Sequence, residues 1–407
     1  MHILFISDNF PPEGNAPATR TFEHAREWVI KGHEVTVVTC APNFPEGKVF
    51  EGYTNKWLSK EIIEGINVWR VKTFITANQG LIKRTIDFVS FMSTSLFFGL
   101  FTRKVDVVVG TSPQFFTVMS TWALAKLKNV PFVFELRDMW PASITAVGAV
   151  TNNRIIHFFE KIELFLYHQA DLIISVTHSF KIELGNRGIT LTKIKVVLNG
   201  VDLEIYKRVS HKDRDFSDQY GLQDKFVVGY IGTHGVAHAL DHIMEAAERL
   251  KAEDHIRIVF AGGGAERLRL EQVVKHRSLT NVIMIPRQPK DRMPQLWSLC
   301  DLSIVHLKNT PLFKTVIPSK IFESMAMGLP ILISTPEGEA TEIIKKHGAG
   351  VIVPAENAQK LSEKIIELAA NKELVSALSL QSECSARHFD RKKLALDMLK
   401  HIQEVVN

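Results

Sequence analysis

A short stretch near residue 320 combines the side-chain types that a nucleotide requires. Ser319, Lys320 and Glu323 lie near the start of an expected helix, because Pro318 suits a first helical turn and Gly328 suits the residue after a last one. Lys320 and Glu323 are three residues apart and share a helix face. A carboxylate can accept hydrogen bonds from two ribose hydroxyls, whereas an ammonium at a helix N-terminus favours phosphate. An ordinary solvated ion pair is the alternative.

Two series of short apolar segments must position these residues. The first series covers residues 3–7, 34–39, 67–72, 106–109, 132–135, 172–175 and 195–198, and the second covers 226–231, 257–261, 282–285, 302–305, 331–333 and 350–353. Helical segments separate them, which is the pattern of an α/β protein with doubly wound parallel sheets. A chain of 407 residues is expected to form two domains of about 200 residues each. The polar stretch at 201–218 predicts the linker.

Composition restricts the partners and the compartment. The net charge of +5 is compatible with an anionic partner such as a nucleotide, a diphosphate or a membrane surface, and it does not choose among them. We expect no nucleic acid partner. Cys40, Cys300 and Cys384 are odd in number and widely spaced, so neither a disulfide framework nor a zinc site is predicted, and a reducing cytosol fits best. The apolar run at 1–7 is too short for a signal peptide and reads as a buried strand.

Several motifs resemble one known family. Residues 318–330, Pro-Ser-Lys-Ile-Phe-Glu-Ser-Met-Ala-Met-Gly-Leu-Pro, resemble the nucleotide-sugar signature of retaining glycosyltransferases of the GT4 type. Within that family the chain looks most like the bacterial L-fucosamine transferases of surface-polysaccharide assembly. The resemblance covers nearly the whole chain and includes, in the family's order, the motifs at residues 42–48, 64–70, 137–141 and 199–202.

The resemblance implies a GT-B fold, in which two Rossmann-like doubly wound domains face each other across a cleft. Residues 1–203 would bind the acceptor, residues 204–387 would bind the nucleotide sugar, and the last helix, 388–407, would pack back onto the first domain. The implied reaction moves N-acetyl-L-fucosamine from a UDP-sugar to an undecaprenyl-diphosphate-linked saccharide. The acceptor attacks from the face that the diphosphate leaves, so no protein nucleophile and no metal cofactor is needed.

The resemblance also assigns donor-binding residues. Glu323 matches the second of two family glutamates and would bind the ribose, whereas Thr315 stands near the place of the first. Ser319 and Lys320 would contact phosphate or sugar. Relatives hold the diphosphate with an Arg and a Lys, where this chain has Thr233 and His238. That charge must then be met by other groups, namely Lys320, Arg287, Lys290 and the backbone N–H groups of 233–235.

For the other candidate contacts to the nucleotide sugar, a purely structural role is also possible. Gly263 lies in a glycine turn between a strand and a helix, where backbone can approach a ligand, although such turns are common. Glu339 begins a helix, where the helix dipole stabilises a carboxylate with or without a donor sugar. His234 and His238 are four residues apart, yet no third ligand is evident. We predict no metal site there or at Asp213-Arg214-Asp215, which reads as solvated surface.

The first half of the chain contributes acceptor-side and catalytic candidates. Gly14 follows the first strand, where a diphosphate could approach the backbone, although a simple turn is the alternative. Arg137 can stabilise developing negative charge but cannot act as a base at neutral pH. Asp138 is expected to orient the acceptor or donor sugar, with capping after its strand as the alternative. Together with Lys320, Arg137 and Asp138 are the predicted catalytic residues.

An unusual segment follows at residues 86–101, in which no charge appears after Asp87 until Arg103. A helix of about fifteen residues spans roughly 22 Å, short of the roughly 30 Å bilayer core. Its basic flanks fit a helix that lies in an anionic membrane interface. A core helix is the alternative, and one helix can do both. The predicted acceptor and membrane contacts are Phe88, Phe91, Phe97, Phe98, Arg103 and Lys104, on a protein peripheral to the cytoplasmic face of the inner membrane.

Two rival functions remain open at this stage. A GT-B protein without catalysis could scaffold a polysaccharide assembly complex, which Thr315, Thr233 and Arg137 favour. Glu323, Lys320 and Asp138 argue against it. A UDP-sugar epimerase of the same fold is the second rival, and the phenylalanine-rich segment disfavours it because an epimerase needs no lipid-facing helix.

Overall fold

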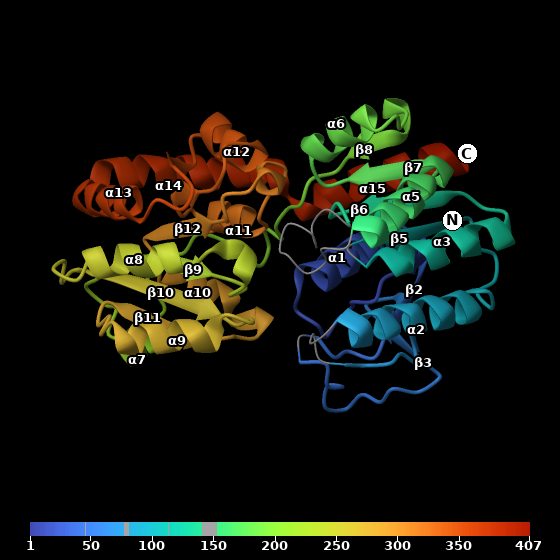
Figure 1. Ribbon diagram of the computed structural model, residues 1–407, viewed down its shortest axis with the longest axis horizontal. Helices are drawn as coiled ribbons and strands as arrows, with labels where there is room; N and C mark the ends of the chain where they lie inside the picture. The colour runs from blue at the N-terminus through green and yellow to red at the C-terminus, as the bar shows by residue number, and fades with distance from the viewer. Residues whose placement is uncertain (45, 77–80, 113, 141–152) are drawn as a thin grey trace. The chain divides into compact units, whose positions relative to one another are not determined.

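The computed structural model describes residues 1–407 except 45, 77–80, 113 and 141–152 (Figure 1). Pro45 and Pro141, which belong to two of the motifs above, therefore lie outside the described residues. The chain divides into two compact units. Unit 1 comprises Met1–Leu198 together with Arg391–Asn407, and unit 2 comprises Asn199–Asp390.

Unit 1 is built on an eight-stranded sheet with the order β3-β4-β2-β1-β5-β6-β7-β8. All neighbours are parallel except β3 and β4. The central strands are fully buried runs rich in β-branched residues, as expected where helices cover both faces. The strands are β1 (His2–Ile6), β2 (Glu34–Cys40), β3 (Leu58–Ile63), β4 (Ile66–Val71), β5 (Val107–Thr111), β6 (Phe132–Leu136), β7 (Leu172–Ser175) and β8 (Ile194–Val196).

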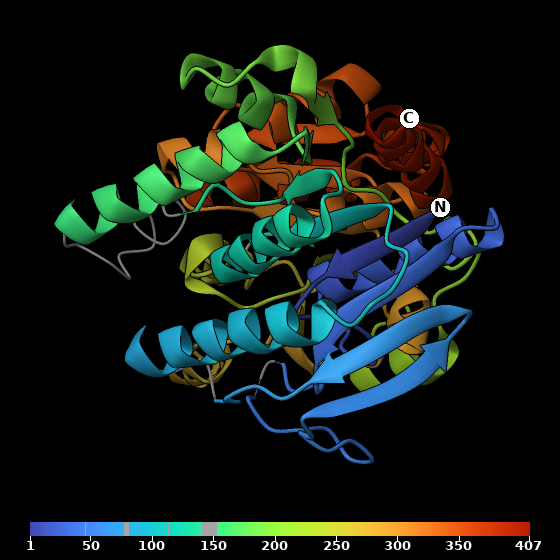
Figure 2. The ribbon, with the colours of Figure 1, turned by 90° about the vertical axis from the view of Figure 1, so that its right-hand side faces the viewer.

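Helices cover both faces of this sheet (Figure 2). One face packs against α1 (Ala16–Ile30) and the last helix, α15 (Arg391–Val406), through a shared apolar cluster that includes Trp28 and Met398. The Trp28 Nε1–H group donates to Ala395 O over 2.8 Å and ties these two helices. The other face carries α2 (Leu81–Gly99), α3 (Phe115–Lys128), α5 (Asn153–Gln169) and α6 (His178–Asn186). Of these, α2, α3 and α5 lie side by side.

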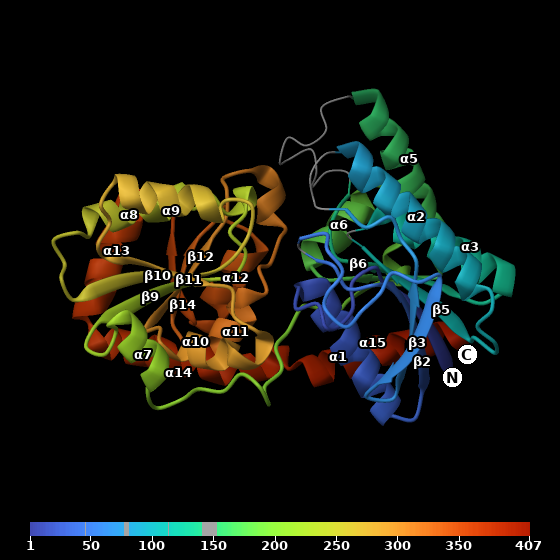
Figure 3. The same cartoon turned by 90° about the horizontal axis from the view of Figure 1, so that it is seen from below.

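Unit 2 has a six-stranded, fully parallel sheet with the order β11-β10-β9-β12-β13-β14 (Figure 3). Its strands are β9 (Phe226–Ile231), β10 (Ile256–Gly262), β11 (Val282–Pro286), β12 (Leu302–His306), β13 (Ile331–Ser334) and β14 (Gly350–Val353). Its helices are α7 (Arg214–Tyr220), α8 (Asp241–Arg249), α9 (Arg267–His276), α10 (Met293–Ser298), α11 (Lys320–Ala326), α12 (Glu339–His347), α13 (Ala358–Ala370) and α14 (Lys372–Ala386). One apolar cluster joins α8, α9 and α13 to the sheet.

The two-domain α/β fold with doubly wound sheets is confirmed, and both predicted series of strands are present. The edge strand β3 was not predicted. The expected irregular stretch at 201–218 includes the start of α7, and Asp213 caps this helix by accepting a hydrogen bond from Phe216 N over 3.0 Å. Cys40 and Cys300 are buried in the two units, whereas Cys384 on α14 is exposed.

The contact between α1 and α15 predicts a measurable loss of stability. Ile402 is fully buried in this interface, so Ile402→Ala should lower the free energy of unfolding of unit 1 by about 2–5 kcal/mol. Urea denaturation followed by tryptophan fluorescence would measure it. The exposed Lys400→Ala change on the same helix is the control and should alter the midpoint little. An unchanged midpoint for Ile402→Ala would show that α15 does not stabilise unit 1.

Candidate functional site

The strand order of unit 2 reverses at β9, which pairs with β10 on one side and β12 on the other. In doubly wound sheets a ligand crevice forms beyond the carboxyl ends of the strands at this reversal. The loop that follows β9, residues 232–235, lies here, and the first residue of α11, Lys320, reaches the same place. The turn after β10, residues 262–264, contacts this loop, because His234 N donates to Gly263 O over 2.8 Å. Three segments distant in sequence therefore meet at one edge of the sheet.

Lys320 is the main charged group at this edge. Its side chain is only 8% exposed, and Nζ has no hydrogen-bond partner among the residues that the structure describes. The ammonium instead lies 3.6 Å from the centre of the Tyr230 ring, which attracts it through its negative face. Burial lowers the pKa of Lys320 to about 7, although Glu323 opposes the shift. An anion that reached Nζ would relieve this desolvation and hold the proton in place.

Tyr230 and two glycines fix the loop around this ammonium. The Tyr230 hydroxyl donates to Thr233 O over 2.8 Å, so the predicted Thr233 is held at the end of its strand. A Cβ atom at Gly232 would lie 3.2 Å from Lys320 Nζ, which means that the backbone approaches the amine closely. Gly262 has φ +139°, and a Cβ there would overlap Gly232 O. A larger residue at either glycine would displace the loop or the amine.

His234 and His238 flank the same tyrosine. Their rings lie 5.9 and 6.0 Å from the Tyr230 ring, and His234 N donates to Gly263 O over 2.8 Å. Burial and the nearby Lys320 lower the pKa of His234 to about 4 and that of His238 to about 3, so both rings are neutral at pH 7. Within the described ranges no group of three His, Cys, Asp or Glu side chains could hold a metal ion.

The remaining predicted donor residues lie on segments around this edge. Ser319 is the N-cap residue of α11, and its side chain makes no capping hydrogen bond with any described group. Glu323 is half-buried in the first turn of the same helix. Glu339, 8% exposed, is the first residue of α12. Arg287 follows β11, and its Cβ lies 4.0 Å from the position that a Cβ on Gly263 would take.

Lys290 is the first residue of a short 3₁₀ helix that follows Arg287 in the chain. The structure therefore groups Thr233, His234, Gly263 and Lys320 closely, with Arg287 at the rim of the same turn.

The predicted catalytic pair of unit 1 follows β6. The backbone N–H groups of Arg137 and Asp138 donate to Ser112 Oγ over 2.8 and 3.2 Å. Arg137 Nε and Nη1 are buried, with no partner in the described part of the chain. Burial lowers the pKa of Arg137 to about 10, opposed by Glu135, so the guanidinium stays charged at neutral pH. Gly14 is exposed in the loop after β1.

Sequence reasoning missed residues that shape both sites. Tyr230 sits in an apolar strand and reads as core, although its ring holds the ammonium. Arg267 ties the turn after β10 to β11, because its Nη1 donates to Gly262 O over 2.6 Å and to Ile285 O over 2.8 Å. In unit 1 the buried Arg20 Nε lies 2.8 Å from Glu135 Oε1. A separation of 115 residues gives this pair no local signal.

The phenylalanines of α2 divide between core and surface. Phe91 is 1% exposed and belongs to the core, so the prediction that it contacts a membrane is wrong. Phe98 packs against the same core, and Phe88 is half-buried beneath Arg84. Phe97 and Phe101, by contrast, are 55% and 61% exposed.

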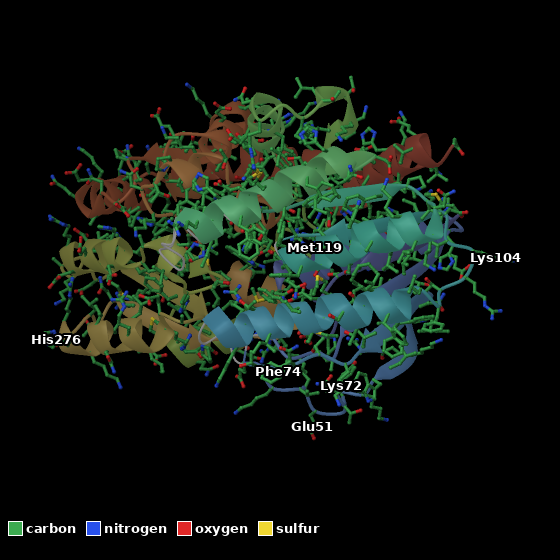
Figure 4. The ribbon with its side chains drawn as sticks, turned by 45° about the vertical axis from the view of Figure 1, so that its right-hand side comes forward. Glu51, Lys72, Phe74, Lys104, Met119 and His276 are labelled. Carbon is green, nitrogen blue, oxygen red and sulfur yellow. The ribbon has the colours of Figure 1, made fainter. Side chains whose placement is uncertain are left out.

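The basic residues Arg103 and Lys104 follow α2 and are exposed, and Figure 4 labels Lys104 at this end of the helix. On α5, Ile155 and Phe158 are also exposed. In the described parts of the chain, no helix combines the length and apolar character needed to cross a membrane.

Both units match models of known families. Residues 18–205 match the model described as Glycosyltransferase Family 4, and residues 212–383 match the model described as Glycosyl transferases group 1. One relative is WcaI of Escherichia coli, a protein named as a colanic acid biosynthesis glycosyl transferase. It is 26% identical over 373 residues, 89% of this chain and 90% of its own length.

A second relative, from Campylobacter jejuni, is N-acetylgalactosamine-N,N'-diacetylbacillosaminyl-diphospho-undecaprenol 4-alpha-N-acetylgalactosaminyltransferase. It is 24% identical and covers 58% of this chain and 61% of its own. Among solved structures, a sucrose-phosphate synthase from Thermosynechococcus elongatus has TM-score 0.80 at 16% identity, with 99% and 98% of the two chains covered. HepE from Anabaena, solved with UDP, has TM-score 0.74 at 16% identity, with 99% and 100% covered. These likenesses confirm the GT-B fold.

The buried amine predicts a pH effect on stability. Because the folded pKa of Lys320, about 7, lies below the ordinary value of 10.5, the unfolded chain binds more protons between these pH values. The contribution of Lys320 to the free energy of unfolding therefore rises with pH across this window and is lost as the pH falls through 7.

Lys320→Met removes the charge and keeps the chain length. We expect this variant to be more stable than the parent by about 1–4 kcal/mol at pH 7, and the difference should shrink towards pH 10. Urea denaturation of both proteins at pH 7, 8.5 and 10 measures it. If the difference in stability between the two proteins did not vary with pH, the pKa of Lys320 would not be lowered by burial.

Proposed function

We propose that this chain, a GT4-type glycosyltransferase by the models that match its two units, is a retaining hexosyltransferase that uses a UDP-sugar. Its acceptor would be an undecaprenyl-diphosphate-linked saccharide in surface-polysaccharide synthesis. The observation that carries the proposal is the Lys320 ammonium, buried at the strand reversal of unit 2 with no hydrogen-bond partner among described residues. A diphosphate supplies the negative charge that this amine lacks.

The nucleotide would extend from this amine along α11. Glu323 lies one helical turn beyond Lys320, so its carboxylate can accept from the ribose hydroxyls while Lys320 contacts phosphate. Ser319 and the backbone of 233–235 offer hydrogen-bond donors for phosphate oxygens. Gly263 permits close backbone approach, and Arg287 and Lys290 add positive charge nearby. The UDP complexes of HepE, which shares the fold, support this choice of nucleotide.

The transfer step requires a stabilised leaving group and an aligned acceptor. The acceptor hydroxyl forms a bond to C1 as the bond from C1 to the diphosphate breaks, and the departing diphosphate takes the acceptor's proton. Lys320 would stabilise the negative charge that develops on the diphosphate. Arg137 adds a fixed positive charge in unit 1, and Asp138 would orient a sugar. No protein nucleophile and no resident metal is part of this proposal.

The kind of acceptor is supported by the relatives. The Campylobacter protein is named for transfer to a diphospho-undecaprenol saccharide, and the Escherichia protein is named for colanic acid biosynthesis. The donor sugar, N-acetyl-L-fucosamine, rests on the motif resemblance alone. With a lipid-linked acceptor, the enzyme would act at the cytoplasmic face of the inner membrane. The exposed Phe97 and Phe101 with Arg103 and Lys104 would then contact anionic lipid.

The first prediction from this proposal concerns UDP affinity. Glu323→Ala should weaken UDP binding about 10–100-fold, because it removes charge-assisted hydrogen bonds to the ribose worth about 1.5–3 kcal/mol. Isothermal titration calorimetry without added metal would measure it, with GDP, dTDP and CMP as competitors for selectivity. Glu373→Ala, an exposed change on α14, is the matched control and should bind UDP like the parent.

Equal affinity of Glu323→Ala and the parent would remove Glu323 from the site. If the parent bound none of the four nucleotides, the protein would instead be a non-catalytic scaffold with the GT-B fold.

The second prediction concerns the membrane. Replacing Phe97 and Phe101 by Ser and Arg103 and Lys104 by Gln should reduce binding to vesicles of phosphatidylglycerol and phosphatidylethanolamine at least tenfold. The change removes exposed apolar area and about 1 kcal/mol of attraction per basic residue. Co-sedimentation at low and high salt would measure it. Ile182 and Leu380 are also exposed, and their double Ser variant controls for general apolar loss. Unchanged sedimentation of the four-residue variant would show that these residues do not hold the protein on the membrane.

A further inference from the structure

Unit 1 contains a small hollow whose polar lining residues have no role in the proposed function. It encloses about 50 Å³ and lies beyond the carboxyl ends of β1, β2 and β4, next to α2. The strand order of unit 1 reverses at β1, so the hollow occupies the usual ligand position of a doubly wound sheet. Its polar lining includes Asp8, Glu13, Thr73 and Asp87, and Phe88 and Phe91 contribute an apolar wall.

Glu13 is the group that points to a ligand. It is only 4% exposed, and its Oε1 accepts from Asn43 N over 2.7 Å and from Phe44 N over 2.8 Å. The other oxygen, Oε2, is buried and has no partner among the described residues. Thr73 is similar: it is 5% exposed, and its Oγ1 is likewise buried with no partner in the described chain. A buried polar atom without a partner costs about 1–3 kcal/mol, and a bound donor group would recover it.

The lining of the hollow is rich in carboxyl groups that are only partly ionised near neutral pH. Burial raises the pKa of Glu13 and of Asp87 to about 7, and it raises the pKa of Asp8 as well. Arg84 acts on Asp8 and Asp87, Arg70 acts on Glu13, and Arg137 acts on Asp8. Arg70 is already engaged, since its Nε lies 2.5 Å from Glu61 Oε1 and its Nη1 donates to Cys40 O. Glu13 Oε2 and Thr73 Oγ1 therefore remain as acceptors that no described group uses.

The size of the hollow limits what can enter it. A cavity that binds a benzene ring has a volume of about 150 Å³. The hollow, at about 50 Å³, therefore admits a small substituent and not a sugar ring. A divalent metal is not favoured, because no three His, Cys, Asp or Glu side chains among the described residues are arranged to hold one. The occupant must therefore be a single polar substituent that carries hydrogen-bond donors and projects from a larger molecule outside.

We propose that this hollow is a specificity subsite for the acceptor sugar, in which Glu13 Oε2 and Thr73 Oγ1 accept hydrogen bonds from one hydroxyl or ammonium substituent. This inference rests on the proposed function, which makes the acceptor a saccharide. Glu13 and Thr73 act here as specificity-determining residues. Asp8 and Asp87 set the negative potential that attracts the substituent. A substituent without donors, such as a methyl group, would leave both oxygens unpaired.

Two substitutions test the subsite while keeping the surrounding loops. Glu13→Gln retains an oxygen for the N–H groups of Asn43 and Phe44, and it turns an NH₂ group into the hollow. Thr73→Val replaces the hydroxyl by a methyl group of equal size. Glu51→Gln, an exposed change in the same unit, is the matched control, and Figure 4 labels Glu51 on the surface. Thermal unfolding midpoints of all variants check that unit 1 remains folded.

Saturation-transfer NMR on the full chain measures ligand contact without turnover. The probes are the methyl α-glycosides of glucose, galactose, 2-amino-2-deoxyglucose and 6-deoxyglucose at 10 mM. We expect transfer to at least one hydroxylated or amino glycoside, and at least a fivefold loss in Glu13→Gln and in Thr73→Val. Glu51→Gln should match the parent. A larger loss for the amino glycoside in Glu13→Gln identifies an ammonium, because an ammonium cannot accept from the new NH₂ group.

Equal transfer in the parent, Glu13→Gln and Thr73→Val would overturn the subsite, as would no transfer from the parent to any of the four glycosides. UDP titration separates this result from the proposed function. Loss of sugar contact in Glu13→Gln with unchanged UDP affinity supports both conclusions. A parent that binds glycosides through Glu13 and fails to bind UDP leaves the subsite standing and removes the nucleotide-sugar donor.

Discussion

Parallel strand pairing that extends in both directions from one central strand is the constraint on which both units depend. It brings the carboxyl ends of the parallel strands to one edge of the sheet. Where the strand order reverses, the loops after neighbouring strands diverge and leave a crevice. In unit 2 this strand is β9, and Lys320 reaches its end from α11. In unit 1 it is β1, and Glu13 lies in the loop that follows. The same construction produces two polar sites that differ in charge.

The difference in charge fits two different ligand groups. At β9 a buried ammonium faces the aromatic ring of Tyr230, and the nearby His234 and His238 are neutral at pH 7. Under the proposed function, this single amine would serve a diphosphate with help from backbone N–H groups. At β1 the lining is rich in carboxyl oxygens, which suits groups that donate hydrogen bonds. The two units thus present opposite chemistry at corresponding places in their sheets.

The sequence predicts the fold better than the site, for a physical reason. The run at His2–Ile6 is continuously apolar, so its burial follows from local pattern. β3 was missed because it is an edge strand, joined to β4 by a two-residue turn. Its Ile62 remains exposed, so the strand lacks the buried apolar pattern of the others. The signature near residue 320 pointed to Lys320, yet Tyr230 lies 90 residues away and only the fold brings the two together. Glu13 likewise acquires its role from Asn43, thirty residues along the chain.

The distribution of thiols has a practical consequence. Burial raises the pKa of Cys300 to about 12 and raises that of Cys40, so neither forms the reactive thiolate at neutral pH. Cys384 is exposed on α14, the helix that packs against α11. A maleimide fluorophore would therefore attach at one defined position of the natural chain. Its emission would report on the helix that carries Lys320 without any engineered cysteine.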